Sequence, residues 1–81
     1  MKIAFSDQAI ESLRDAPLQI RAAFNKQIRF LVGNLHHPSL RVKKYDEGRD
    51  LWQARVNQNW RFYFTIKGDT YRIEDVIPHP K

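Results

Sequence analysis

Cysteine is absent from this chain of 81 residues, and glycine is scarce, with only three residues. Without cysteine, the sequence holds neither a disulfide framework nor a thiolate metal site. The scattered glycines form no phosphate-binding loop and no dinucleotide-binding motif, and no serine lies in a nucleophile-elbow pattern. His36 and His37 are adjacent, so their side chains diverge, and no carboxylates are spaced to join them. We therefore expect neither a metal site nor a cofactor.

Long apolar runs are also missing from the sequence. No segment approaches the roughly 20 apolar residues that a membrane-spanning helix needs. The first residues, MKIAFSDQAIESL, carry acidic side chains early and lack the apolar core of a signal peptide. These features predict a cytoplasmic protein with no membrane partner. The length predicts a single domain over residues 1–81, with any site on an open surface or in a shallow groove.

The sequence carries an excess of positive charge. The formal net charge is +5 and the sequence pI is about 9.9, which is a high charge density for so short a chain. A basic balance of this kind favours an anionic partner, such as nucleic acid, an acidic protein or a membrane surface.

The first half of the chain reads as a strand followed by two helices. KIAF, at positions 2–5, is a short strand, and Ser6 or Asp7 can cap the helix that follows. Pro17 ends that helix and can open the next one. Gly33 and Asn34 are a plausible stop for the second helix. Apolar residues recur in the second helix at spacings of three and four, and they form one stripe for packing on a sheet: Ile20, Phe24, Ile28, Leu31 and Leu35.

The second half alternates apolar and polar residues, as strands do. LRVKKY, LWQARVN, WRFYFTI and TYRIEDVI are separated by short turns, which predicts an antiparallel meander. The alternation breaks near Glu74 and Asp75, where we expect a bulge or a strand end. The sequence therefore predicts an α+β fold, with an N-terminal strand and an α-helical hairpin packed on one face of a three- to four-stranded antiparallel sheet.

In the segment NWRFYF, at positions 59–64, strand alternation puts the side chains on two opposite faces. Trp60, Phe62 and Phe64 point one way, toward a core that should also hold Phe24, Ile28 and Leu31. Arg61 and Tyr63 point the other way. The residues on this second face are mostly basic, with the acidic residues expected in turns: Arg41, Lys43, Gln53, Arg55, Arg61, Tyr63 and Arg72. This pattern favours an anion-binding surface, and a solvated sheet face is the alternative.

The tail VIPHPK holds His79 between two prolines, which restrict the backbone around it. An imidazole can donate or accept a proton near neutral pH. A stiffly held histidine at the edge of a basic surface suits general acid–base chemistry. The alternative is a stiff terminal segment without a chemical role.

The order of elements, the basic LRVKKY, the hairpin LWQARV–turn–WRFYF and the ending IPHPK together resemble the RelE/ParE superfamily of bacterial toxins. These proteins are the toxin halves of type II toxin–antitoxin pairs. The resemblance covers essentially the whole chain. It is most specific in the hairpin, where the strand after the turn carries an arginine at its second position, Arg61.

The RelE branch of this superfamily consists of metal-independent endoribonucleases that cut mRNA on the ribosome. The resemblance implies that Arg61 grips the phosphate and that His79 transfers a proton, as the two catalytic residues. It leaves the general base unassigned. The residues expected to bind the substrate are Arg55, Lys43, Lys44, Tyr63 and Lys81.

The resemblance also implies two partners, a cognate acidic antitoxin protein and mRNA in the ribosomal A site, with a toxin–antitoxin hetero-oligomer as an expected assembly. Two other functions remain open at this point. One is a ParE-like toxin, which binds DNA gyrase and needs no ribonuclease residues. The other is a non-catalytic module of the same fold that binds nucleic acid or protein.

Overall fold

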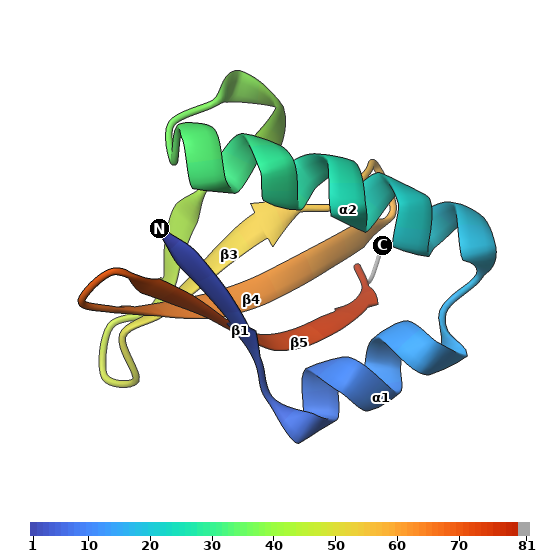
Figure 1. The fold of residues 1–81 in the computed structure, drawn as a ribbon, viewed down its shortest axis with the longest axis horizontal. Helices are drawn as coiled ribbons and strands as arrows, with labels where there is room; N and C mark the ends of the chain where they lie inside the picture. The colour runs from blue at the N-terminus through green and yellow to red at the C-terminus, as the bar shows by residue number, and fades with distance from the viewer. Residues whose placement is uncertain (80–81) are drawn as a thin grey trace.

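The computed structural model describes residues 1–79, so Lys81 lies outside the described part of the chain. Within these residues the predicted order of elements is confirmed (Figure 1). No helix among them is long and apolar enough to cross a bilayer. In chain order the elements are β1 (Lys2–Phe5), α1 (Asp7–Asp15), α2 (Leu18–Gly33), the 3-10 helix η1 (Pro38–Leu40), β2 (Lys43–Asp46), β3 (Leu51–Arg55), β4 (Trp60–Lys67) and β5 (Thr70–Pro78).

The five strands of residues 1–79 form one sheet, in the order β1-β5-β4-β3-β2. Strands β2 to β5 are the predicted antiparallel meander. Strand β1 lies parallel to β5, with Ile3 opposite Tyr71. The sheet is therefore mixed and one strand wider than the predicted three to four. Sequence alternation identified β1 as a strand, but it carries no information on which neighbour a strand pairs with or in which direction.

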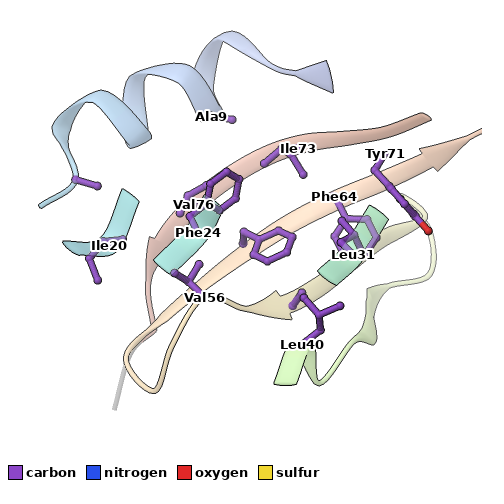
Figure 2. Close-up of a cluster of buried hydrophobic side chains, with 13 residues drawn as sticks. Ala9, Ile20, Phe24, Leu31, Leu40, Val56, Phe64, Tyr71, Ile73 and Val76 are labelled. Carbon is purple, nitrogen blue, oxygen red and sulfur yellow. The ribbon is translucent and has the colours of Figure 1, made fainter. Parts of the chain in front are cut away.

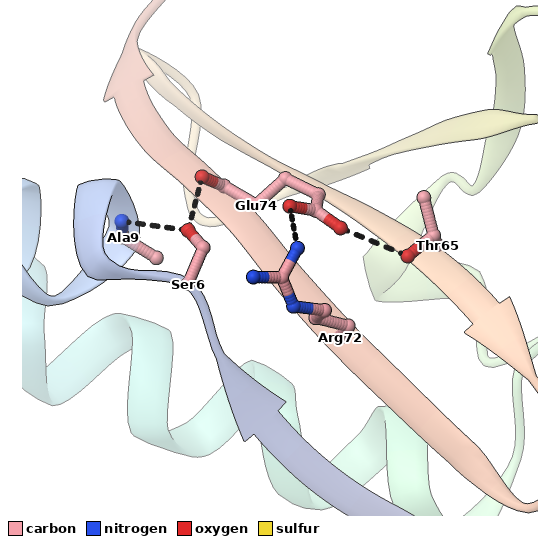
Figure 3. A network of polar contacts seen from close by, with 5 residues as sticks. All are labelled: Ser6, Ala9, Thr65, Arg72 and Glu74. Carbon is pink, nitrogen blue, oxygen red and sulfur yellow. Dashed lines mark hydrogen bonds and ion pairs between the residues drawn. The ribbon is translucent and has the colours of Figure 1, made fainter. Parts of the chain in front are cut away.

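Ser6 begins α1 and ties it to β5. Its Oγ accepts a hydrogen bond from the Ala9 N–H at 3.0 Å, which confirms the predicted cap. The same hydroxyl donates to the Glu74 carbonyl oxygen at 2.7 Å (Figure 3). Helix α2 ends at Gly33 as predicted, with Pro17 as its N-cap.

The core lies between α2 and one face of the sheet (Figures 1 and 2). Phe24 of α2 meets Phe62 of β4 edge to face, with ring centroids 5.3 Å apart. Four of the six predicted core residues are at most 1% exposed, namely Phe24, Leu31, Phe62 and Phe64. Ile28 and Trp60 pack against this cluster but remain partly exposed. The predicted core face of β4 is therefore confirmed.

Helix α1 packs along β5, next to the core that α2 covers (Figure 1). Ala9 of α1 joins the core, but the Ser12 hydroxyl donates to the Asp75 carboxylate at 2.7 Å. Asp75 lies directly opposite Tyr63 in the sheet. Helix α1 thus joins the core under α2 through Ala9, and through Ser12 it borders the face that carries Arg61.

Phe62→Ala is expected to lower the free energy of unfolding by about 3–5 kcal/mol, because the side chain is fully buried and a cavity would remain. Urea denaturation followed by circular dichroism measures this loss. Phe5→Ala is the matched control, since Phe5 is 41% exposed on the edge strand and should lose far less. Equal losses for the two variants would contradict the assignment of the core.

Candidate nucleic-acid interface

A hollow of about 220 Å³ lies on the sheet face that carries Arg61, opposite the α2 core. Its position follows from the strand register, because Lys43 is opposite Gln53 and Arg55 is opposite Arg61. We call it the cationic hollow. Four of its five lining side chains are positively charged: Arg41, Lys43, Gln53, Arg55 and Arg61.

Arg55 and Arg61 face each other directly across β3 and β4. Like charges in this arrangement destabilise a sheet. The Nε atom of Arg55 is also buried, and no hydrogen-bond partner for it exists among the described residues. Burial, followed by the positive charges of Arg55 and Arg41, lowers the pKa of Arg61. The hollow therefore concentrates positive charge that a bound anion would neutralise.

No ion pair within residues 1–79 involves the four cations of the hollow. The ion pairs of the described chain lie elsewhere, such as Lys44 with Asp50 and Arg72 with Glu74. The acidic residues of the described chain thus leave the positive charge of the hollow without a compensating partner.

The guanidinium of Arg61 is held by the turn between β3 and β4. Its Nη1 donates to the carbonyl oxygens of Asn57 at 2.8 Å and Trp60 at 3.0 Å, with a longer contact to that of Gln58 at 3.4 Å. Within residues 1–79 its Nε and Nη2 make no hydrogen bond. Two N–H groups on one edge of a guanidinium match two oxygens of a phosphate. One edge of Arg61 is thus fixed by the protein, and the other can bind a ligand.

Gln27 of α2 connects the two segments that carry Arg41 and Arg55. Its side-chain amide donates to the Arg55 carbonyl oxygen at 2.8 Å and to the Ser39 carbonyl oxygen at 3.1 Å. The Ser39 hydroxyl donates back to Oε1 of Gln27 at 2.8 Å. Arg41 follows η1 in the left-handed backbone conformation, at φ 47°. This partly buried network fixes the wall of the hollow, and sequence reasoning missed it.

The basic surface continues beyond the cationic hollow. A wider groove of about 520 Å³ lies among α2, η1 and the turn between β3 and β4. It shares Arg41 and Arg55 with the hollow and adds Lys26. An extended anionic chain could therefore contact the protein on both sides of Arg55.

Two of the predicted substrate-binding residues lie outside the hollow. Lys44 points to the opposite side of β2 from Lys43, because neighbouring residues alternate along a strand. Its Nζ lies 4.5 Å from the ring centroid of Trp52 and donates to the Asp50 carboxylate, which raises the pKa of Lys44. Tyr63 is buried beside the hollow, and its hydroxyl accepts a hydrogen bond from Gln53 at 3.0 Å.

Arg72 does not add to the basic surface either. Its guanidinium donates to the Glu74 carboxylate at 2.7 Å, and the Thr65 hydroxyl donates to the same carboxylate at 2.9 Å (Figure 3). Glu74 and Asp75 both lie within β5. The expectation that the acidic residues gather in turns is therefore wrong at this end of the sheet, and the cationic character is confined to the β2–β4 side.

His79 follows directly after β5. Its backbone N–H donates to the Asn59 carbonyl oxygen at 2.7 Å, which extends the pairing of Pro78 with Trp60 by one residue. The alternation of the strand puts His79 on the same side as Ile77, which is opposite Arg61. The imidazole is exposed and does not line the hollow. Residues 1–79 hold no cluster of three or more potential metal ligands.

Arg55→Gln is expected to raise the free energy of unfolding by about 1 kcal/mol at low salt, because it removes both a repelled charge and a buried unpaired N–H. The gain should shrink in higher salt, which screens exposed charges. Urea denaturation at two salt concentrations measures the effect. A loss of stability at low salt would show that Arg55 supports the fold rather than straining it.

No known protein family and no curated protein matches the sequence. Solved structures do match the fold. A YoeB/ParE toxin from Agrobacterium tumefaciens superposes with a TM-score of 0.82 at 13% identity, over 99% of this chain and 100% of that one. RelB–RelE from Methanococcus jannaschii matches with a TM-score of 0.76 at 21% identity, over 93% and 88% of the two chains. YoeB–YefM from Staphylococcus aureus matches with a TM-score of 0.79 at 18% identity, over 99% and 98%. The chain has the fold of the RelE/ParE toxin superfamily.

Proposed function

We propose that this protein is the toxin of a type II toxin–antitoxin pair, and that it inhibits translation in the cytoplasm by cutting mRNA in the ribosomal A site without a metal ion. The observation that carries the proposal is the opposed pair Arg55 and Arg61 in a hollow with no carboxylate partner among residues 1–79. The fold it shares with RelE, YoeB and YafQ toxins supports the same conclusion.

The proposed reaction needs charge stabilisation and proton transfer. The 2′-oxygen of a ribose attacks the adjacent phosphorus, the bond from phosphorus to the 5′-oxygen breaks, and a cyclic phosphate forms. A base takes the proton of the 2′-hydroxyl, and an acid gives a proton to the leaving 5′-oxygen. The crowded phosphate gains negative charge in the transition state, and fixed cations stabilise it there.

The residues of the hollow fit this chemistry in separate roles. Arg61 would hold two phosphate oxygens with its open edge, and Arg55 and Lys43 would balance the added charge. His79 would protonate the 5′-oxygen once RNA lies across the strand ends. The general base is left unassigned. Lys44 has no part in the proposal, because it lies on the other side of β2.

Cleavage in a cell-free translation reaction tests the proposal. The purified protein should cut an mRNA only when ribosomes are translating it, and primer extension would map cuts within codons in the A site. Growth arrest by a folded protein that cuts no mRNA would overturn the ribonuclease proposal. That result would favour the gyrase-binding alternative, which an assay of DNA supercoiling then tests.

The proposed antitoxin partner should bind the cationic hollow through an acidic segment that folds on binding. The Methanococcus jannaschii and Staphylococcus aureus neighbours are toxin–antitoxin complexes, which supports a partner of this kind. We expect the affinity to fall as salt is added, because exposed charges are screened over about 8–10 Å. Arg55→Ala and Arg61→Ala should weaken binding.

Calorimetric titration with a small acidic protein encoded by an adjacent gene, taken as the candidate antitoxin, measures that affinity. Lys2→Ala is the control, since Lys2 is exposed on the edge strand and pairs with Asp69. Binding that is insensitive to salt, or that is weakened as much by Lys2→Ala as by Arg61→Ala, would contradict the proposed interface.

A further inference from the structure

A second hollow, of about 350 Å³, adjoins the first on the same side of the sheet. Its chemistry is different, because tyrosines and carboxylates predominate in its lining. Arg49 is the one cation that lines it within residues 1–79, and it is paired with Asp46. Its lining includes Tyr45, Tyr63, Leu51, Glu74 and Asp75, together with Gln8 of α1. The function proposed above for the cationic hollow makes no use of this site.

Irregular pairing on both sides shapes the second hollow. The register of β2 and β3 shifts between Lys44 and Asp46, so Tyr45 is the extra residue of a bulge. The register of β4 and β5 shifts between Tyr63 and Phe64, so Glu74 is the extra residue of a second bulge, next to Asp75. A bulge re-aims the side chains next to it, and bulges are frequent near functional sites. Both bulges turn side chains into this one hollow.

Tyr45 is an exposed aromatic side chain in a fixed environment. It is 57% exposed, the second most exposed large apolar side chain in the described chain. Its ring meets that of Tyr63 edge to face, with centroids 4.9 Å apart and an interplanar angle of 68°. Tyr63 in turn is fixed by the hydrogen bond from Gln53, which lines the cationic hollow. The aromatic pair is therefore joined directly to the proposed phosphate site.

We propose that the second hollow binds an unpaired nucleobase of the RNA whose phosphate lies at Arg61, with the base stacked on Tyr45. This inference rests on the proposed function and names a recognition site within it. Arg61 and Tyr63 lie two residues apart on one side of β4, which is about 7 Å along a strand. A base and a phosphate of neighbouring nucleotides can occupy the two hollows together.

Asp75 gives this site a preference among bases. Its Oδ1 accepts from the Ser12 hydroxyl and from the Val76 N–H. Its Oδ2 makes no hydrogen bond to any other residue within 1–79. A carboxylate oxygen accepts from the exocyclic amino group of adenine, cytosine or guanine, whereas uracil has no amino group and offers only its ring N3–H. The site should therefore favour a base that carries an amino group.

Binding of short 2′-O-methyl RNA oligomers, which cannot be cut, tests the stacking role. The probes are oligocytidine, oligouridine and an abasic oligomer with the same backbone, each followed by fluorescence anisotropy. Tyr45→Ala should weaken binding of oligocytidine by roughly 5- to 150-fold, the range for one stacked base. Binding of the abasic oligomer should not change. Tyr45→Phe keeps the ring, so it should bind oligocytidine like the wild type.

The role of Asp75 is tested by the ratio of the affinities for oligocytidine and oligouridine. Asp75→Asn retains an oxygen for Ser12 but can present an amide N–H to the base, so the preference for oligocytidine should fall or reverse. An unchanged ratio would overturn the assignment of Asp75. Circular dichroism establishes that each variant is folded.

The outcomes separate the base site from the proposed function. If Tyr45→Ala binds oligocytidine like the wild type, the base site is wrong, whether or not mRNA is cut. The base site is also wrong if the wild type binds no oligomer, or if Tyr45→Ala weakens only antitoxin binding. If stacking is lost as expected but the wild type cuts no mRNA on ribosomes, the base site stands and the ribonuclease proposal fails.

Discussion

Arg61→Ala is expected to lower the rate of ribosome-dependent mRNA cleavage by about 10²–10³, the loss typical of removing one preorganised donor to a transition state. The side chain lies off the α2 core and its hydrogen bonds within residues 1–79 all go to carbonyl oxygens of one turn, so the fold should persist. Single-turnover cleavage on ribosomes programmed with one mRNA measures the rate.

Two further variants sharpen this test. Arg61→Lys keeps the charge but loses the two-pronged contact, so it should restore only part of the activity. Arg72→Ala is the matched control, because Arg72 also lies in the sheet but is already paired with Glu74. Arg72→Ala should cut like the wild type. A folded Arg61→Ala protein that retains full activity would place the phosphate site elsewhere.

The alternation of side chains was sufficient to predict the core side of β4 and the basic side of the sheet. Phe62 and Phe64 are fully buried, and Arg61 projects from the other side, as the pattern required. This worked because a half-buried strand must place its apolar residues on one face. Lys43 and Lys44 are neighbours, so the same alternation puts their side chains on opposite sides of the strand. Applied strictly, it excludes Lys44 from a site that includes Lys43.

Features that depend on tertiary contacts could not be predicted. The alternation puts Tyr45 on the same face as Lys43, but no glycine or proline marks the bulge at Tyr45, so the register shift that shapes the aromatic hollow left no trace in the sequence. The left-handed backbone of Arg41 is imposed by η1 and its neighbours, since arginine has no preference for it. Gln27 did leave a signal, as a polar residue beside the apolar stripe of α2, but its partners are distant in sequence.

His79→Ala is expected to lower the cleavage rate by about 10²–10⁴, the range for removal of a general acid or base. The alternation of β5 puts the imidazole on the side of Arg61, and its backbone is held by Asn59. Single-turnover rates of the wild type and the variant, on ribosomes programmed with one mRNA, measure the effect.

A binding role for His79 would give a different result, and the two can be told apart. If the imidazole only transfers a proton, His79→Ala should bind uncleavable RNA like the wild type while cutting slowly. His79→Gln keeps a hydrogen-bonding side chain but cannot cycle a proton, so it should be as slow as the alanine variant. His36→Ala is the control, since His36 is an exposed histidine in the loop between α2 and η1. If His79→Gln restores the rate, then the residue positions RNA by hydrogen bonding, and the leaving oxygen takes its proton from another group.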